Sequence, residues 1–302
     1  SAEARRIELV EETPRLVRAM ALNVVHGLIA TSGADIIIYN VADGSILQEL
    51  PIVHADVIGA SAFSRDGQWL FTGDDSGLIV AWQRDASDEW IQAETITAHE
   101  GRIWDVAVHP DGTEMVTVGE DQTVKRWQVG DDAIVAVPEG EFSHDNEVLT
   151  AAYSLDGRWL ATGDRDGIIF VTDRNTPDAE RIRLSGHANL ITDLAFSPDS
   201  QRLASGSRDR SVRLWEFDAA GAMRPLDDEL VGPGAAINAL AFSPDGTQLT
   251  VSYNDLSVIN WDVGLVDWTS IACGIANRNF TDDEVDRFLF GGAVPPIDCT
   301  QG

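Results

Sequence analysis

Lysine and cysteine are nearly absent from this 302-residue chain. Lys125 is the only lysine, and 21 basic side chains face 50 acidic ones, for a net charge of −29. A surface this acidic repels phosphate backbones, so we predict no nucleic acid partner. Arginines gather only at residues 5–6 and 208–213, where we interpret them as ion-paired surface.

The two cysteines, Cys273 and Cys299, both lie near the C-terminal end. Two thiols are too few for a disulfide scaffold, and a structural zinc site needs about four clustered ligands. The sequence leaves open whether they pair or stay free. No apolar run reaches the roughly 18 residues of a membrane span, and the N-terminus shows no secretion signal. We therefore predict a cytoplasmic location without membrane contact.

The chain does contain a pattern repeated at a fixed period. An apolar strand, a turn with Asp-Gly or Asp-Ser, a second strand, a tight turn and a third strand recur five times, after a weaker first copy. The period is 43 to 46 residues between the ends of the third strands, which are Tyr39, Trp82, Trp127, Thr172, Trp215 and Trp261. This spacing fits the roughly 40–45 residues of a four-stranded propeller blade.

Residues 186–217 resemble a WD repeat almost letter for letter. In that family a His, a Ser or Thr, an Asp and a Trp form a hydrogen-bonded tetrad. The resemblance implies two complete tetrads, His99, Thr117, Asp121, Trp127 and His187, Ser205, Asp209, Trp215. Incomplete tetrads are expected in the second repeat, with His54, Thr72, Trp82 and Ser76 at the Asp position, and in the fourth, with His144, Thr162, Asp166 and Thr172 at the Trp position. Because the same trio of side chains recurs in different repeats, we predict a structural role for it and not a catalytic one.

The fold class predicted is all-β, a propeller of six four-stranded blades, with seven blades as the alternative. Outer strands are expected at residues 46–50, 89–96, 134–137, 181–184 and 223–230. We expect residues 6–10 to supply the fourth strand of the last blade, which closes the ring. The propeller would span residues 1–263, and residues 264–302 would form a short helical tail packed on it. That tail resembles the end of bacterial multidomain WD-repeat proteins of the STAND signalling and defence type.

The repeat also places a candidate binding surface. In the family resembled, the start of the first strand of each repeat lies at the mouth of the central channel, where peptides bind. The matching positions lie five residues after the repeat His or its equivalent, and are Arg18, Gly59, Trp104, Leu149, Thr192 and Asn238, with Asp105 and Asp193 next to them. Trp104 and Leu149 are large and apolar beside charged residues, which is the composition of a binding hot spot. The alternative is that Trp104 plugs the channel.

These observations predict a non-catalytic module that binds a protein or peptide. Four of the six histidines occupy tetrad positions, and His26 and His109 lie on hairpin turns away from the channel mouth. No Gly-rich phosphate-binding loop occurs, so no enzyme activity, metal or cofactor is expected. The partner could be an effector or NTPase region of the same polypeptide in a larger bacterial signalling protein. A propeller enzyme or a small-ligand binder that uses the central channel is the alternative.

Overall fold

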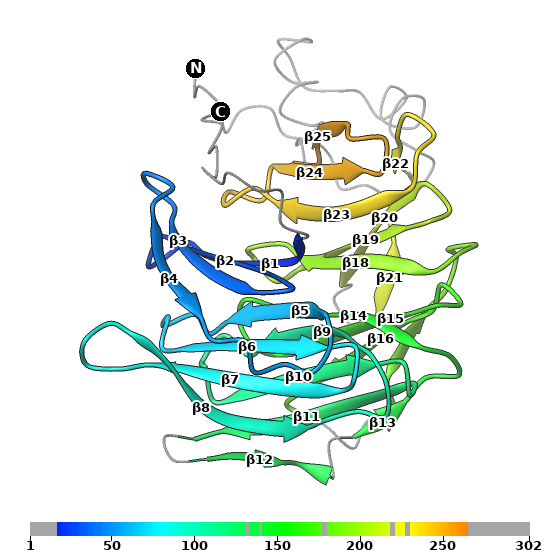
Figure 1. The fold of residues 1–302 in the computed structure, drawn as a ribbon. Helices are drawn as coiled ribbons and strands as arrows, with labels where there is room; N and C mark the ends of the chain where they lie inside the picture. Colours follow the sequence, from blue (N-terminus) through cyan, green and yellow to red (C-terminus); the bar gives the residue numbers. More distant parts are fainter. Residues whose placement is uncertain are drawn as a thin grey trace, which may run out of the picture.

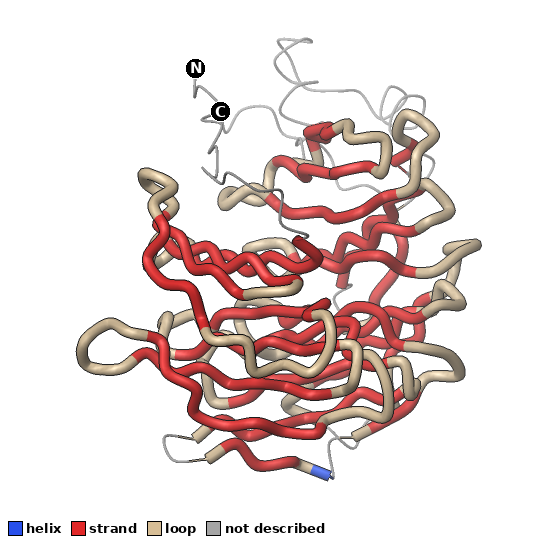
Figure 2. The backbone as a smooth tube through the Cα atoms, in the orientation of Figure 1, coloured by secondary structure: helices blue, strands red, loops and turns tan. Residues whose placement is uncertain are grey.

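Six antiparallel sheets are arranged as blades around a common centre in the computed structural model, as predicted (Figure 1). The structure describes residues 17–130, 133–138, 141–176, 180–217, 221–226 and 230–264. Within these ranges the regular elements are strands, and the short blue segment in Figure 2 is a 3-10 turn at Pro138 and not an α-helix. The predicted strand at residues 6–10, the predicted helical tail and both cysteines lie outside the described residues.

Each blade is an antiparallel meander in which the first strand pairs with the second and the second pairs with the third. Blade 1 contains β1 (Val17–Asn23), β2 (Leu28–Gly33), β3 (Ile36–Asn40) and β4 (Ile46–Leu50), and blade 2 contains β5 (Ile58–Phe63), β6 (Trp69–Asp74), β7 (Leu78–Arg84) and β8 (Trp90–Thr97). Blade 3 contains β9 (Ile103–Val108), β10 (Glu114–Gly119), β11 (Thr123–Val129), β12 (Ile134–Ala136) and β13 (Phe142–Ser143). Blade 4 contains β14 (Val148–Tyr153), β15 (Trp159–Asp164), β16 (Ile169–Asp173) and β17 (Ile182–Leu184).

The last two blades depart from four simple strands. Blade 5 contains β18 (Ile191–Phe196), β19 (Arg202–Ser207), β20 (Ser211–Phe217), β21 (Met223–Pro225) and β22 (Leu230–Val231), and blade 6 contains β23 (Ile237–Phe242), β24 (Gln248–Tyr253) and β25 (Val258–Asp262). The outer strand expected over residues 223–230 is therefore two short strands, both paired with β20. Blade 3 divides its outer strand in the same way. In the described residues, blade 6 has three strands.

The blades have two kinds of connection, which define two faces. Hairpins between the first and second strands, and between the third and fourth, lie on what we call the lower face, at the left of Figure 1. Turns between the second and third strands, and the links to the next blade, lie on the upper face at the right. The first strand of each blade is innermost, so its start faces the upper end of the central channel.

Among the described residues the apolar core forms five clusters, and each joins two consecutive blades. The second strands of blades 2 to 5 are buried along their whole length, and each combines consecutive apolar residues with a Thr or Ser and a Gly. Glycines near their ends admit the next blade: a Cβ on Gly73 would lie 2.8 Å from Ile103, and one on Gly163 would lie 2.7 Å from Ile191. Each blade therefore packs on the blade that follows it in the chain.

The junction between blade 6 and blade 1 differs from the other five. In the described part of the chain, no apolar cluster spans it, and β1 does not pack on β23 as the other adjacent innermost strands pack on each other. Val17 and Met20 on β1 are correspondingly exposed. Five junctions thus carry the cohesion seen in this structure.

Candidate functional site

Hydrogen-bonded tetrads run through blades 3 and 5. His99 Nδ1 lies 2.8 Å from Asp121 Oδ1, and its Nε2 lies 2.7 Å from Thr117 Oγ1, which accepts a bond from the Trp127 indole at 3.0 Å. Because a carboxylate only accepts, the ring donates from Nδ1 and its Nε2 accepts the Thr117 hydroxyl. Burial lowers the pKa of His99, so the ring is neutral at neutral pH.

Blade 5 repeats this geometry with a serine as the hydroxyl. His187 Nδ1 lies 3.0 Å from Asp209 Oδ2 and its Nε2 lies 2.8 Å from Ser205 Oγ, which accepts the Trp215 indole at 2.9 Å. Each chain of bonds ties the second and third strands to the loop that precedes the first. Such repetition within the blades serves packing and offers no single reactive centre.

In blade 4 the predicted acidic partner is wrong, and in blade 2 the structure contains an acidic partner where the repeat pattern left none. His54 pairs with Asp74 at 3.0 Å, and His144 pairs with Asp164 at 2.9 Å. Asp166, the expected partner in blade 4, instead accepts a bond from Asn146. The physical reason is that strand residues two apart project to the same side, so an acid at the end of the second strand reaches the ring as well as one in the turn.

The six predicted binding positions share one backbone feature. In every blade, the pairing of the first and second strands skips one residue, which makes that residue the extra one of a β-bulge. The skipped residues are Arg18, Gly59, Trp104, Leu149, Thr192 and Asn238. A bulge bends the strand and re-aims the side chain of the unpaired residue. These six positions, five with a side chain and Gly59 without one, form a ring at the upper end of the channel, which we call the bulge ring.

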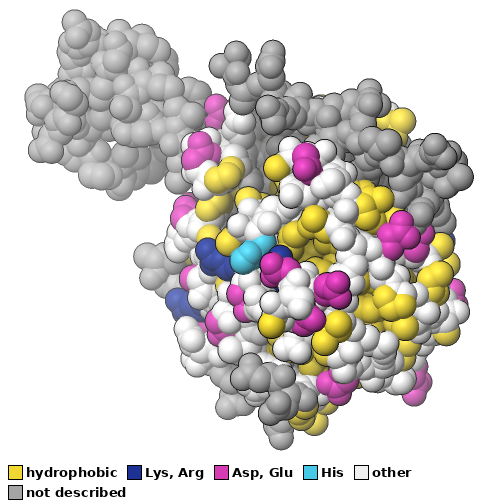
Figure 3. Space-filling model, turned by 60° about the vertical axis from the view of Figure 1, so that its left-hand side comes forward, with side chains coloured by type: hydrophobic (Ala, Val, Ile, Leu, Met, Phe, Trp, Pro, Cys, Tyr) yellow, Lys and Arg dark blue, Asp and Glu magenta, His cyan; other side chains and the backbone are white. Residues whose placement is uncertain are grey.

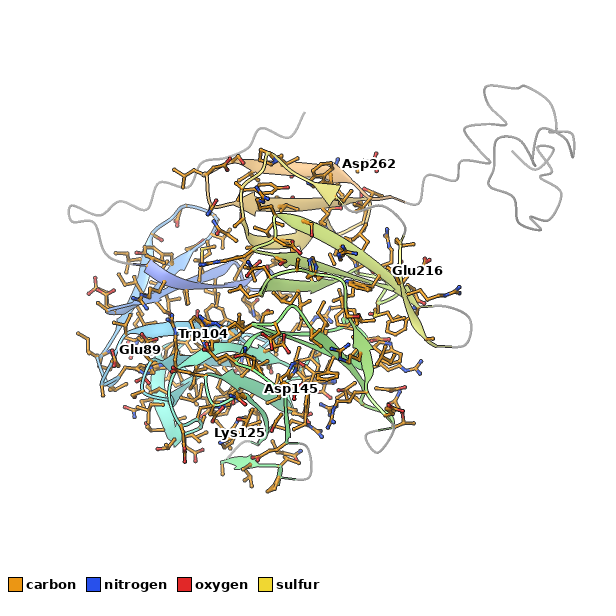
Figure 4. The ribbon with its side chains drawn as sticks, turned by 90° about the vertical axis from the view of Figure 1, so that its right-hand side faces the viewer. Glu89, Trp104, Lys125, Asp145, Glu216 and Asp262 are labelled. Atoms are coloured by element: carbon orange, nitrogen blue, oxygen red, sulfur yellow. The ribbon has the colours of Figure 1, made fainter. Side chains whose placement is uncertain are left out.

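Charged groups gather around Trp104 on this ring. The Arg102 guanidinium lies over the Trp104 ring, 3.9 Å from its centroid, and its Nε is 3.0 Å from Asp75 Oδ1. Arg18 Nη1 lies 3.4 Å from the other oxygen of Asp75, so one carboxylate joins blades 1, 2 and 3. Figure 4 shows Trp104 among the inner strands of the upper face, whereas Glu216 and Asp262 lie at the periphery.

Trp104 also packs inward. Its ring lies against the buried cluster of blades 3 and 4 that contains Val118 and Val148, and the ring is half-buried. The indole Nε1 has no hydrogen-bond partner among the described residues. Trp104 is thus held between the cluster of blades 3 and 4 and a stacked arginine, and its indole N–H is buried.

Sequence reasoning missed Arg102 and Asp75. Asp75 lies in the turn after β6, and only the folded ring brings it to Arg18, 57 residues away in sequence. A signal for Arg102 was present, since residues 102 and 104 are two apart and can share one side of an extended chain. The structure brings Arg18 and Trp104 together through these two residues, and it describes no polar side-chain bond for Leu149, Thr192 or Asn238 in the residues it covers.

Asp105 and Asp193 have a different environment from the one predicted. Asp105 Oδ2 accepts bonds from Ala151 N at 3.0 Å and Thr150 Oγ1 at 3.2 Å in the next blade. Asp193 Oδ2 accepts one from Leu240 N at 2.7 Å in blade 6. Both carboxyl groups therefore link adjacent blades. Burial raises the pKa of Asp105 to about 6 and that of Asp193 to about 7, and the neighbouring charge of Asp105 adds to the shift of Asp193.

These raised pKa values predict a pH dependence of stability. Between about pH 4 and pH 7 the folded protein holds protons on Asp105 and Asp193 that the unfolded chain releases, so their contribution to the free energy of unfolding falls as pH rises through this window. We expect the free energy of unfolding of Asp193→Asn to fall less than that of the parent protein as pH rises from about 4 to about 7. Urea unfolding at a series of pH values measures both slopes.

The buried His54 and His99, whose pKa values burial lowers, contribute a slope of the opposite sign, so the comparison between variant and parent isolates the aspartate. Asp56→Asn, at an exposed carboxylate on the upper face, is the matched control and should keep the parental slope. Equal slopes for Asp193→Asn and the parent would contradict the assignment.

Two further properties bear on function. No group of three or more His, Cys, Asp or Glu side chains is placed to hold a metal ion within the described ranges. The same ranges contain no helical stretch with the length and apolar character that a bilayer crossing needs.

Comparison with known proteins matches the repeats to one family model. The model of the WD domain, G-beta repeat, matches residues 44–83, 90–128, 137–173, 180–216 and 226–262, which is more than half of the chain.

Several curated proteins are similar to this chain. The serine-threonine kinase receptor-associated protein of Mus musculus is 28% identical over 177 residues, which cover 59% of this chain and 47% of that protein. The target of rapamycin complex subunit wat1 of Schizosaccharomyces pombe is 25% identical over 172 residues, 55% of this chain and 52% of that protein. A probable cytosolic Fe-S cluster assembly factor of Schizosaccharomyces japonicus is 34% identical over 125 residues, 41% of this chain and 20% of that protein. The matched regions thus span about half, or less, of these relatives' lengths.

Proposed function

The chain belongs to the WD domain, G-beta repeat family, and from this premise we propose that it is a non-catalytic platform whose upper face binds a protein or peptide. The observation that supports this most is the bulge ring, in which Trp104 lies beneath Arg102 and beside the Arg18–Asp75 ion pair. Tryptophan and arginine are the residues most enriched in binding hot spots. A half-buried ring that is already fixed by packing loses little conformational entropy when a partner covers it.

The charge of the upper face indicates which peptides would fit it. The chain carries a net charge of −29, whereas the upper rim around Trp104 presents two arginines that share one aspartate. A peptide that places an apolar or aromatic side chain on Trp104 and an acidic group near Arg18 and Arg102 would complement this rim. Leu149, Thr192, Asn238, Asp105 and Asp193 complete the proposed surface, the two aspartates by holding adjacent blades in position.

A capture experiment followed by a binding measurement tests the proposal. A protein captured on the parent chain is purified and its Kd is measured against the parent, Trp104→Ala and Arg18→Glu. We expect Trp104→Ala to weaken binding about thirty-fold or more, because a hot-spot aromatic contributes roughly 2 kcal/mol or more. We expect Arg18→Glu to weaken it less and mainly through a slower association rate.

Arg165→Ala is the matched control, since Arg165 lies on the upper face of blade 4 and pairs with Glu147 at 2.8 Å, away from Trp104. All variants should retain the parental circular dichroism spectrum. Trp104→Ala should lower the Tm, because the ring packs against the cluster of blades 3 and 4, so binding is measured well below the Tm of every variant. Binding that survives Trp104→Ala unchanged, or that Arg165→Ala weakens equally, would move the site elsewhere.

The wider setting stays a prediction. The named relatives come from animals and fungi, so they lend no support to a bacterial signalling protein with an upstream effector or NTPase. The cytoplasmic location is likewise proposed. Sequencing the complete gene tests the first point, because a STAND-type NTPase region ahead of the propeller would establish a partner on the same polypeptide.

A further inference from the structure

The lower face carries an apolar groove that the upper-face proposal does not use. The groove has a volume of about 300 Å³ and lies across four blades, with lining from the ends of β1, β5 and β9 and from the turns that follow. Its apolar lining includes Leu22, Val24, Val25, Phe63, Val108 and Leu155. Figure 3 shows this face, where yellow apolar side chains gather around a hollow with magenta carboxylates between them.

Four of these side chains are far more exposed than folding requires. Leu22 is 54% exposed, Val24 80%, Val25 69% and Leu155 47%. Contiguous exposed apolar side chains with a polar rim mark interaction surfaces, whereas isolated ones need no explanation. The four side chains come from two blades and meet at one groove, so they form a contiguous patch of the kind that marks an interaction surface.

The hairpin fold does not demand these valines. In blades 2, 4, 5 and 6 the corresponding turn begins with a serine whose hydroxyl bonds an aspartate two residues later, as in Ser64–Asp66 and Ser154–Asp156. Blade 1 has Val24 and Val25 in its turn, and closes it through Asn23, whose side chain accepts a bond from His26 N. Asn23 also donates to the carbonyl oxygens of Ser64 and Arg65, which fixes the blade 1 turn against blade 2. The groove therefore has a rigid wall.

Acidic side chains lie on three of the four turns that border the groove. The turns of blades 2, 3 and 4 that border it each carry an exposed aspartate, Asp66, Asp111 and Asp156, and Arg65 is the charged residue within the lining. Burial alone would raise the pKa of Asp111, but hydrogen bonds from Thr113 and the neighbouring His109 outweigh it and lower the pKa, which keeps this carboxylate ionised. With a net charge of −29 on the chain, a second copy, a nucleic acid or an anionic membrane would be repelled here.

We propose that this lower-face groove binds a segment of a partner protein in which apolar side chains are flanked by lysine or arginine. The apolar side chains would fill the groove beside Val24, Val25 and Leu155, and the flanking cations would meet Asp66, Asp111 and Asp156. This site lies on the face opposite Trp104, so the propeller would hold two partners at once.

A peptide-binding measurement on the full chain tests the proposal. The probe is a labelled synthetic peptide with central leucines flanked by arginines. The control peptide has serines in place of the leucines. We expect the leucine peptide to bind the parent about tenfold or more tightly than the serine peptide, because each buried apolar side chain strengthens binding by about that factor. Added salt should weaken both.

The decisive variant is Val24→Asp. It adds a negative charge, so a peptide held by charge alone would bind it at least as tightly, whereas a peptide seated in the groove should lose about tenfold. Leu155→Asp, on the opposite wall, should act in the same way. Val258→Asp makes the same change at an exposed valine of blade 6, outside the groove, and should leave the leucine preference intact.

Three results would overturn the proposal. The first is no preference of the parent for the leucine peptide, which would leave general electrostatic attraction only. The second is an equal loss in Val24→Asp and Val258→Asp. The third is a dimer of the parent in sedimentation that Val24→Asp dissociates, because a second copy would then occupy the groove. Trp104→Ala should not change peptide binding here, so failure of the upper-face proposal remains distinguishable.

Discussion

Replacing Asp74 by alanine is expected to destabilise the protein by about 3 kcal/mol, the cost of leaving several buried groups without partners. Asp74 is buried and accepts hydrogen bonds from His54 Nδ1 at 3.0 Å, from Ser76 N at 2.9 Å and from Leu78 N at 3.0 Å. Burial alone would raise the pKa of Asp74, but the bonds from Ser76, Leu78 and His54 outweigh it and lower the pKa. Urea unfolding measures the loss.

Ser76→Ala is the matched comparison, because Ser76 occupies the position where the repeat pattern expects the acid. It tests whether the residue at that position or Asp74 holds the His54 ring. Ser76 donates one bond to Asp74 at 2.7 Å, so its loss should cost only about 1 kcal/mol. Asp74→Asn keeps the size of the side chain and provides a milder variant if the alanine protein does not fold. A loss for Ser76→Ala as large as that for Asp74→Asn would refute the assignment.

A second large effect is expected at Glu114, where blade 3 meets blade 4. This buried carboxylate accepts bonds from Arg126 Nη2 at 2.6 Å and from Tyr153 OH at 2.6 Å, and it pairs with Arg174 of blade 4. Burial lowers the pKa of Arg174. Glu114→Ala would leave two largely buried guanidinium groups uncompensated, which costs about 3 kcal/mol or more. Thermal and urea unfolding should both show it.

The matched control is Arg158→Ala, which breaks the 2.8 Å ion pair with Asp173 at a half-exposed arginine. A surface pair contributes about 1 kcal/mol or less, so this variant should stay close to the parent. Glu114→Gln tests the charge separately from the shape, and we expect an intermediate loss. Equal stability of Glu114→Ala and Arg158→Ala would mean that the network does not hold the two blades together.

The periodic third strands were enough to predict six blades and their order, although blades 1 and 4 have Tyr39 and Thr172 where the others have tryptophan. Trp82, Trp127, Trp215 and Trp261 each lie on the third strand of a sheet, as their spacing indicated. The divided outer strands of blades 3 and 5 were not predicted, because β12, β13, β21 and β22 have only two or three residues each. Segments that short show no usable alternation of apolar and polar residues.

Only part of the candidate site was predicted, because the repeat pattern locates positions within a blade but not contacts between blades. Counting from the repeat histidine located the residues that the structure shows to be bulged, although a bulge leaves no mark in the sequence. Asp75 could not be found that way, since its approach to Arg18 depends on how two blades sit in the ring. Val24 and Val25 could have been noticed, because they interrupt a turn pattern that the hairpins of blades 2, 4, 5 and 6 keep.

The junction between blades 6 and 1 has a consequence for how the molecule comes apart. Within the described residues, apolar clusters join blades that are consecutive in the chain, so we expect opening of the propeller to begin at the junction between blades 6 and 1. Amide hydrogen exchange should then show a gradient, fastest in blades 1 and 6 and slowest in blades 3 and 4, where opening requires the loss of a neighbour on each side. The upper-face cluster around Trp104 and the lower-face groove both draw on blade 1. A partner at either site should therefore slow amide hydrogen exchange in blade 1. Its binding can then be measured as protection of the amides of β1 and β2.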